Sequence, residues 1–347
     1  MTINRQWLLD NRPVGMIGPE HFKYVETTIP EPGEGEVLIR NLMFSFDPTQ
    51  RGWTMDRESY LPPVQIGEPM RAGCVAQVVK SNHPDFTEGQ LVQATNGWQD
   101  YAVVDPSHPP SSIRPVPEGA PPEMMLSVLG VTGLTAYFGL LDLGNPQPGE
   151  TVLVSGAAGA TGSVAAQIAR IKGCRVVGIA GGPEKCAWLT DTAKLDVALD
   201  YKAGDLDAQI GAACPEKWNV FFDNVGGSVL NTVMGQLQEG ARLVLCGAIS
   251  QYTHLEQGAK GPGNYGNLLF QRVIPNLGRI GLLTDKIRPK FEELGILEFE
   301  NLATDGDIDW SKLERPLDTD EAQSYEQSML DEFHKMHEAQ EEPRKAS

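Results

Sequence analysis

The stretch 152-VLVSGAAGATGSVAAQIAR-170 combines three patterns that together decide a fold. It begins with apolar residues typical of a buried strand and ends with the spacing of a helix. Between them lies a turn of glycine and alanine, in which Gly156, Gly159 and Gly162 stand at i, i+3 and i+6. Where a strand turns sharply into a helix, free backbone N–H groups can bind a pyrophosphate if no side chain intrudes. The stretch therefore predicts a dinucleotide-binding turn.

Glycines of this spacing also serve as purely structural turns in α/β proteins, so the surrounding chain matters. Strands are predicted at 151–155, 175–180, 218–223 and 242–247, and helices at 123–143, 162–172 and near 228–237. Strands that alternate with helices form a parallel sheet covered on both faces. We therefore expect an α/β fold in which residues 123–285 form a doubly wound (Rossmann) domain, and this context favours the dinucleotide.

The first third of the chain has a different texture. Short alternating runs such as 36-EVLIRNLMF-44 and 74-CVAQVVK-80 are separated by proline and glycine clusters. That pattern is typical of a compact, mostly antiparallel β domain, which we expect over residues 1–122. Two domains also suit the length of 347 residues, because a single hydrophobic core rarely grows so large.

Composition excludes several classes of function. No run reaches the roughly 18 apolar residues of a spanning helix, and the start of the chain lacks the apolar segment of a secretory signal. A cytoplasmic protein without a membrane role is therefore expected. The net charge of −18 argues against a nucleic-acid partner. The cysteines are dispersed and predicted to be reduced, mostly buried thiols: Cys74, Cys174, Cys186, Cys214 and Cys246.

The end of the second predicted strand selects the dinucleotide. An NAD site has an acidic residue there for the ribose 2′-OH, whereas an NADP site has a cation for the 2′-phosphate. The sequence reads 180-AGGPEKC-186, with no acid at the strand end and Lys185 close behind. Glu184 could accept from a ribose, which keeps NAD open as the alternative. The pattern favours NADPH as the cofactor.

Several motifs in order then resemble one family. They are 155-SGAAGATGSVAAQIAR-170, 176-VVGIAGGPEKC-186, 199-LDYK-202, 222-FDNVGG-227, 245-LCGAISQY-252, 45-SFDPTQRG-52 and 97-GWQDYAV-103. They are similar to the zinc-independent medium-chain dehydrogenases/reductases, in the group of leukotriene B4 12-hydroxydehydrogenase (prostaglandin reductase) and the 2-alkenal and curcumin reductases. The resemblance runs from residue 1 to about 285. It implies a GroES-like β-barrel for residues 1–122 and a homodimer.

The resemblance also implies roles for individual residues. The pyrophosphate would lie against the backbone of Ala160, Thr161, Gly162 and Ser163. Lys185 and Tyr201 would bind the 2′-phosphate, and Asn224 would lie near the ribose and nicotinamide. The nicotinamide side of the cleft would be lined by Cys246, Gly247, Ala248, Ile249, Ser250, Gln251 and Tyr252. The alternatives are that Tyr201 is a surface aromatic and that Asn224 caps a turn.

The chemistry expected of this group needs no metal. Cys74 is the sole cysteine before residue 174, so a tetrahedral site of nitrogen and sulfur ligands cannot be assembled in the first domain. Reduction of a C=C bond conjugated to a carbonyl suits such a chain: hydride goes to the β carbon, hydrogen-bond donors hold the enolate charge, and a proton reaches the α carbon. The predicted substrate is thus an α,β-unsaturated aldehyde or ketone, a small-molecule enal or enone. Alternatives are a quinone or enoyl-thioester reductase, and a catalytically impaired NADPH-binding protein that acts by interaction.

Tyrosines are the candidates for the hydroxyl near the enolate. Tyr252 comes first because it follows a predicted strand at the carboxyl edge of the sheet. Tyr265 comes second, since it lies in the glycine-rich segment 261–272. Several relatives have an active-site tyrosine where this chain has Phe270. Tyr60 and Trp98 are predicted as walls of the cleft, with core packing as the alternative.

The last 62 residues, 286–347, depart from the family pattern. They hold 17 acidic and 8 basic residues and lack the G-x-N-x-G-K-like turn and closing strand of the family. This composition predicts an atypical acidic segment that is partly helical or disordered.

Overall fold

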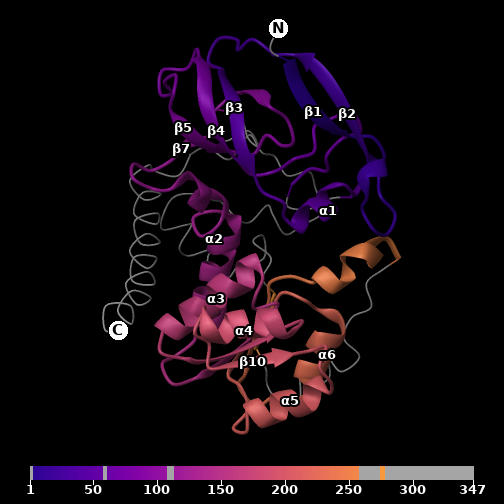
Figure 1. Cartoon of the computed structure of the whole chain (residues 1–347), viewed down its shortest axis with the longest axis vertical. Helices are drawn as coiled ribbons and strands as arrows, with labels where there is room; N and C mark the ends of the chain where they lie inside the picture. The colour runs from indigo at the N-terminus through magenta and orange to yellow at the C-terminus, as the bar shows by residue number, and fades with distance from the viewer. Residues whose placement is uncertain (1–2, 58–60, 108–112, 258–273, 278–347) are drawn as a thin grey trace, which may run out of the picture. The chain divides into compact units, whose positions relative to one another are not determined.

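The computed structural model describes residues 3–57, 61–107, 113–257 and 274–277, which form two compact units. The first unit runs up to Val131 and takes in the segment that starts at Ile249; the second runs over Thr132–Ala248 and includes the last described strand (Figure 1). The predicted limits 1–122 and 123–285 stay predictions. The acidic segment 286–347 lies outside the described residues.

The second unit is built on a six-stranded parallel sheet. In space its strands follow the order β10-β9-β8-β11-β12-β13. Their bounds are β8 Thr151–Ser155, β9 Arg175–Ala180, β10 Val197–Asp200, β11 Val220–Asp223, β12 Arg242–Leu245 and β13 Ile274–Leu277. Numbered within the sheet, this is the order 3-2-1-4-5-6 of a dinucleotide-binding fold, in which the carboxyl edge at the switch point takes the ligand. The predicted doubly wound sheet is confirmed.

Helices cover both faces of this sheet. They are α3 Ala160–Ile171, α4 Pro183–Asp191, α5 Leu206–Ala213 and α6 Gly227–Gly235, with the π-helical η3 Gly139–Gly144 before β8 (Figure 1). Phe221 belongs to the core cluster shared with α5 and α6, whereas Phe222 packs against Gly139 of η3. Neighbouring residues of β11 therefore point to opposite, covered faces, which explains why the strand is buried throughout.

The continuous helix predicted over 123–143 is wrong. The chain forms three short pieces instead: η2 Pro122–Leu126, α2 Val131–Phe138 and then η3. Between the first two, Ser127 has φ −122° and ψ −106°, outside the helical region. At Gly130 a Cβ atom would lie 2.6 Å from the carbonyl oxygen of Met125. The backbone crosses itself closely there, so the apolar spacing continues while the helix does not.

The first unit is antiparallel, as predicted. Its five-stranded sheet has the order β6-β3-β4-β5-β7, with β3 Val37–Phe44, β4 Cys74–Ser81, β5 Leu91–Ala94, β6 Tyr101–Val104 and β7 Arg114–Pro115. A separate hairpin pairs β1 Ile3–Leu9 with β2 Phe22–Thr28, and the remaining short elements are η1 Pro19–His21, α1 Thr49–Trp53 and η4 Ile249–Gln257. The core of the sheet holds alternate residues of β3 and β4, among them Val37, Ile39, Ala76 and Val78.

Candidate functional site

The glycine turn between β8 and α3 is tight because its backbone folds back on itself. Gly156 has φ +59°, and the N–H of Gly159 donates to the Gly156 carbonyl oxygen over 2.8 Å. A Cβ atom on Gly162 would lie 2.3 Å from that same oxygen. Gly162 is buried, so its lack of a side chain serves close packing of the helix on the turn. The three glycines thus have different roles: Gly156 adopts a positive φ, Gly159 closes the turn by a hydrogen bond, and Gly162 allows close packing.

The start of α3 offers the donors that a pyrophosphate needs. The first-turn N–H groups of Ala160, Thr161 and Gly162 have no partner within the helix, while Ser163 N–H donates to Gly159 O over 2.9 Å. Gly159 and Ala160 are exposed, so the helix terminus is open. With only glycine and alanine between β8 and the start of α3, and the helix dipole behind them, the local geometry fits a dinucleotide. The contacts themselves stay a prediction.

A second feature of the site lies at the ends of β9 and β10. Tyr201, 45% exposed, stands over Gly181: a Cβ atom on that glycine would lie 2.7 Å from Cε1 of the ring. The Nζ atom of Lys202 is 5.8 Å from the centre of the same ring. Lys185 is exposed in the first turn of α4, which begins two residues after Gly181. The structure therefore places the predicted Tyr201 at the end of β9, a strand end that Lys185 follows within a few residues. It also places Lys202, which the sequence analysis did not name, beside the Tyr201 ring.

The sequence reasoning missed Asp200 at this place. No acid ends β9, but Asp200 ends β10, directly beside Ala180 in the sheet. Its carboxylate accepts from the N–H groups of Gly182 and Lys202, each over 2.9 Å, and these two bonds hold the pKa of Asp200 below its usual value. The carboxylate thus orders the loop after β9. The strand pairing that reveals this could not be read from one strand alone.

Three strand ends meet at the other half of the edge. Asp223 is fully buried, and its carbonyl oxygen accepts from the N–H groups of Cys246 and Gly247 over 2.9 Å each. Burial, and then the charge of Asp223, raise the pKa of the Cys246 thiol to about 12. Asn224, half-buried, donates from Nδ2 to the carbonyl oxygen of Ser155 over 2.7 Å. The predicted Asn224, Cys246 and Gly247 therefore lie at the carboxyl ends of β11 and β12, beside the turn.

The remaining residues predicted to line the nicotinamide side of the cleft do not all belong to the second unit. Ala248 closes the second unit, but Ile249, Ser250, Gln251 and Tyr252 belong to η4 in the first unit. Tyr252 is half-buried. Tyr60, Tyr265 and Phe270 lie outside the described residues. The roles of both candidate tyrosines stay predictions.

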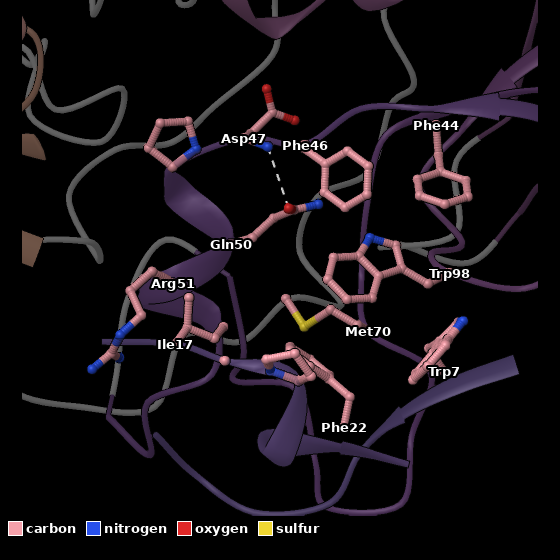
Figure 2. A pocket seen from close by; sticks show the side chains of 13 residues that line it. Trp7, Ile17, Phe22, Phe44, Phe46, Asp47, Gln50, Arg51, Met70 and Trp98 are labelled. Carbon is pink, nitrogen blue, oxygen red and sulfur yellow. Dashed lines mark hydrogen bonds between the residues drawn. The ribbon is translucent and has the colours of Figure 1, made fainter. Parts of the chain in front are cut away.

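The first unit holds an apolar pocket of about 490 Å³. Its walls include Phe22, Phe44, Phe46 and Trp98, with the Phe22 and Phe46 rings 4.9 and 5.3 Å from the Trp98 ring. Figure 2 shows these rings together, with Met70 beside them and Gln50 hydrogen-bonded to the Asp47 N–H. Trp98, predicted as a cleft wall, lines this pocket; the phenylalanines were missed because the segments that carry them are distant in sequence.

Polar groups beside the pocket are already engaged. The Arg51 side chain donates to the carbonyl oxygens of Pro13 and Gly15, and Gln50 donates to those of Ser45 and Arg71. The lining is thus mostly aromatic and apolar, which suits a flat or bulky apolar group. Phe46 is 73% exposed and therefore accessible.

The described residues contain neither a candidate metal site nor a candidate membrane-spanning helix. No group of three or more His, Cys, Asp or Glu side chains there could hold a metal ion. Within the same residues, no helix has the length and apolar character needed to cross a membrane.

Comparisons with known proteins cover both units. A family model described as N-terminal domain of oxidoreductase matches residues 5–110, and one described as zinc-binding dehydrogenase matches residues 160–265. The NADPH-dependent curcumin reductase of Escherichia coli is 44% identical over 253 residues, which are 73% of this chain and 72% of the relative. Prostaglandin reductase 1 of Bos taurus is 38% identical over 263 residues, or 76% and 78% of the two chains.

A solved structure agrees with these relatives. CurA of Vibrio vulnificus in complex with NADPH has 41% identity and a TM-score of 0.74, covering 83% of this chain and 85% of that one. The motifs, the strand order and the identity over most of the chain all point the same way. The chain therefore belongs to the zinc-independent medium-chain dehydrogenases/reductases, in the group that contains the curcumin and prostaglandin reductases.

Proposed function

We propose that this chain is an NADPH-dependent reductase of the C=C bond of α,β-unsaturated aldehydes or ketones. The observation that carries the proposal is the carboxyl edge of the parallel sheet. A bare turn opens α3 there, and two lysines with Tyr201 gather around the end of β9. Relatives named as NADPH-dependent curcumin reductase and prostaglandin reductase share this fold and family, which supports both the cofactor and the bond class.

Charge favours NADPH over NADH at the end of β9. Lys185 and Lys202 are exposed and can meet a 2′-phosphate, and the Tyr201 hydroxyl can donate to it. The nearby Asp200 carboxylate accepts from two backbone N–H groups through Oδ1, which ties it to the loop after β9. The ordered loop then presents cations where an NAD enzyme has its acid.

The residues of the second unit would bind and orient NADPH, and the cofactor would supply the reducing power. When bound, NADPH would supply the hydride, two electrons with one proton, that the β carbon of the enone takes up. The α3 terminus would hold the pyrophosphate, and Asn224 would meet the nicotinamide ribose. A donor that faces the carbonyl oxygen would stabilise the enolate charge, and the α carbon takes its proton from water or a tyrosine hydroxyl. Tyr252 and Tyr265 remain the candidates for this donor.

The aromatic pocket supports a substrate with a sizeable apolar part. Its volume of about 490 Å³ and the accessible Phe46 ring suit an aryl or long alkyl substituent. Aromatic rings also pack favourably against a flat conjugated system, with offset or edge-on geometry. We therefore expect aryl enones to be better substrates than small alkyl ones.

The test is NADPH oxidation by the full-length chain against a panel of aryl enones, alkyl enones, quinones, acyl thioesters and simple ketones. We expect turnover with enones, fastest with aryl ones, no loss on adding a chelator, and poor use of NADH. Phe46→Ala should raise KM for aryl enones and leave KM for small alkyl enones unchanged. Preference for quinones or acyl thioesters would select one of those substrate classes instead. A protein that binds NADPH and turns over no enone would refute the proposal.

A further inference from the structure

A buried carboxylate lies beside the glycine turn and is not among the proposed cofactor contacts. Asp223 ends β11 with no exposed surface. Its Oδ1 accepts from the Ser155 hydroxyl over 2.6 Å and from Val225 N–H over 3.1 Å, and its Oδ2 accepts from Gly226 N–H over 3.0 Å. Burial raises the pKa of this carboxyl, with the three donors opposing the shift. A carboxylate is costly to bury even when hydrogen-bonded, so a merely space-filling role would be better served by an apolar residue.

The carboxylate fixes the direction of the Ser155 hydroxyl. A serine hydroxyl has one proton to donate, and here Ser155 donates it to Asp223. Its oxygen is then free to accept, and it accepts from Asn224 N–H over 2.9 Å. Ser155 is itself fully buried and immediately precedes Gly156. The Ser155 hydroxyl thus connects the carboxyl end of β8 to the carboxyl end of β11 by two hydrogen bonds.

The Asn224 side chain completes the network. Its Nδ2 donates to the carbonyl oxygen of Ser155 over 2.7 Å, so the amide nitrogen faces Ser155 and Oδ1 faces away. The hydrogen bonds thereby decide the orientation of an amide whose two ends look alike. Asn224 Cβ also lies 3.4 Å from where a Cβ on Gly156 would be. The asparagine is therefore packed against the turn with its acceptor on the outer side.

We propose that Asp223 and Ser155 are positioning residues for the dinucleotide: together they hold Asn224 so that Oδ1 accepts from a ribose hydroxyl on the nicotinamide side. The inference rests on the proposed NADPH function and extends it to two residues that do not touch the ligand. The adenine half of the cofactor, at the ends of β9 and β10, does not depend on this network. Removing a member of this network should therefore weaken binding of the nicotinamide half of the ligand and leave binding of the adenine half unchanged.

The experiment compares two ligands by isothermal titration calorimetry with the full-length chain. NADPH carries both halves, whereas adenosine 2′,5′-bisphosphate carries the adenosine half, with its 2′-phosphate and a single 5′-phosphate, and has no nicotinamide ribose. Asp223→Asn places an NH₂ group among donors, and Ser155→Ala removes the hydroxyl. Each should raise the Kd for NADPH about tenfold or more, the loss of one or two hydrogen bonds, and change the Kd for the bisphosphate less than about twofold.

Two further variants serve as a negative control and a positive control for these Kd changes. Asp196→Asn is the matched control, since the Asp196 carboxylate accepts from Val176 N–H over 2.7 Å at the opposite, amino edge of the same sheet. It should leave both Kd values unchanged. Lys185→Ala should weaken both ligands alike, because both carry the 2′-phosphate. If Asp223→Asn does not fold, Ser155→Ala carries the test, because its substitution adds no donor to the buried cluster.

The outcomes separate the two ideas. A selective loss of NADPH binding in the Asp223 and Ser155 variants supports positioning. An equal loss of both ligands, or no loss of either, overturns it while the cofactor proposal stands. A wild-type chain that binds neither ligand overturns the cofactor proposal and, with it, the positioning role.

Discussion

Adding one methyl group to the glycine turn should damage both stability and cofactor binding. In Gly162→Ala the new Cβ would lie 2.3 Å from Gly156 O, 2.9 Å from its carbonyl carbon and 3.0 Å from the Ala157 Cα. All three neighbours are backbone atoms, so no side chain can swing aside. An ordinary carbon contact needs roughly 3.5 Å, which means that α3 and the turn must separate by about 1 Å. Such a shift moves the very N–H groups proposed to hold the pyrophosphate.

The size of the effect follows from known cases of overpacking. Forcing an extra methyl group into a close-packed site costs about 1–3 kcal/mol. For a domain of this size each kcal/mol lowers Tm by about 2–4 °C, so we expect a fall of about 2–12 °C. The Kd for NADPH should rise as well, because misplacing donors by about 1 Å weakens their hydrogen bonds.

Differential scanning fluorimetry with and without NADPH measures both effects. The matched control is Gly235→Ala at the end of α6, where a Cβ would meet nothing within 4 Å. There the substitution should be neutral or raise Tm slightly, because alanine loses less backbone entropy than glycine in a helix. Gly162→Ala with the Tm and NADPH shift of the wild type would show that the turn is not as tight as described, and would refute the reasoning.

Three further outcomes are expected. Gly181→Ala should displace the Tyr201 ring, whose nearest atom would lie 2.7 Å from the new Cβ, and so weaken NADPH binding more than NADH binding in a fluorescence titration. Lys185→Ala should likewise weaken NADPH binding more than NADH binding, and the wild-type preference should shrink at high salt because exposed charges are screened; an unchanged preference would exclude a role for this lysine. Burial raises the pKa of Cys74 to about 11 and that of Cys246 to about 12, so alkylation at pH 8, followed by mass spectrometry, should be slow at both until the chain is unfolded. The stability that these neutral thiols contribute is complete below about pH 8.5 and is lost as pH rises towards those values; fast labelling of the folded chain would contradict the burial of Cys74 and the half-burial of Cys246.

The parts of the fold that sequence could predict are those whose signals are local. The β8, turn and α3 stretch shows a strand period, a bare turn and a helix period within 19 residues, and all three patterns are confirmed. The alternation of strands and helices likewise predicted the parallel sheet. The helix over 123–143 failed because Gly130 is needed where the backbone passes Met125, a contact that apolar spacing does not record.

The parts of the site that sequence missed depend on pairing between strands. Asp200 orders the loop after β9 only because β10 lies next to β9 in register, with Asp200 opposite Ala180. The aromatic pocket has the same origin, since Phe22 on β2 meets Trp98 across 76 positions of the chain. Trp98 was predicted as a cleft wall, but neither Asp200 nor Phe22 stands out in its own segment. Such contacts become visible once the sheet order is known.

The same distinction separates the two halves of the proposed cofactor site. At the end of β9 the groups proposed to discriminate between the cofactors are exposed cations, Lys185 and Lys202, whose attraction salt can screen. At the end of β11 the groups are buried, and Asp223 acts through Ser155 on an asparagine that already resembled a turn cap. Because that network is shielded from water, its hydrogen bonds keep their strength at any ionic strength and lose it when a donor or acceptor is removed. Preference between NADPH and NADH should therefore depend on charge, whereas the placement of the reacting end should depend on the geometry of a few buried hydrogen bonds.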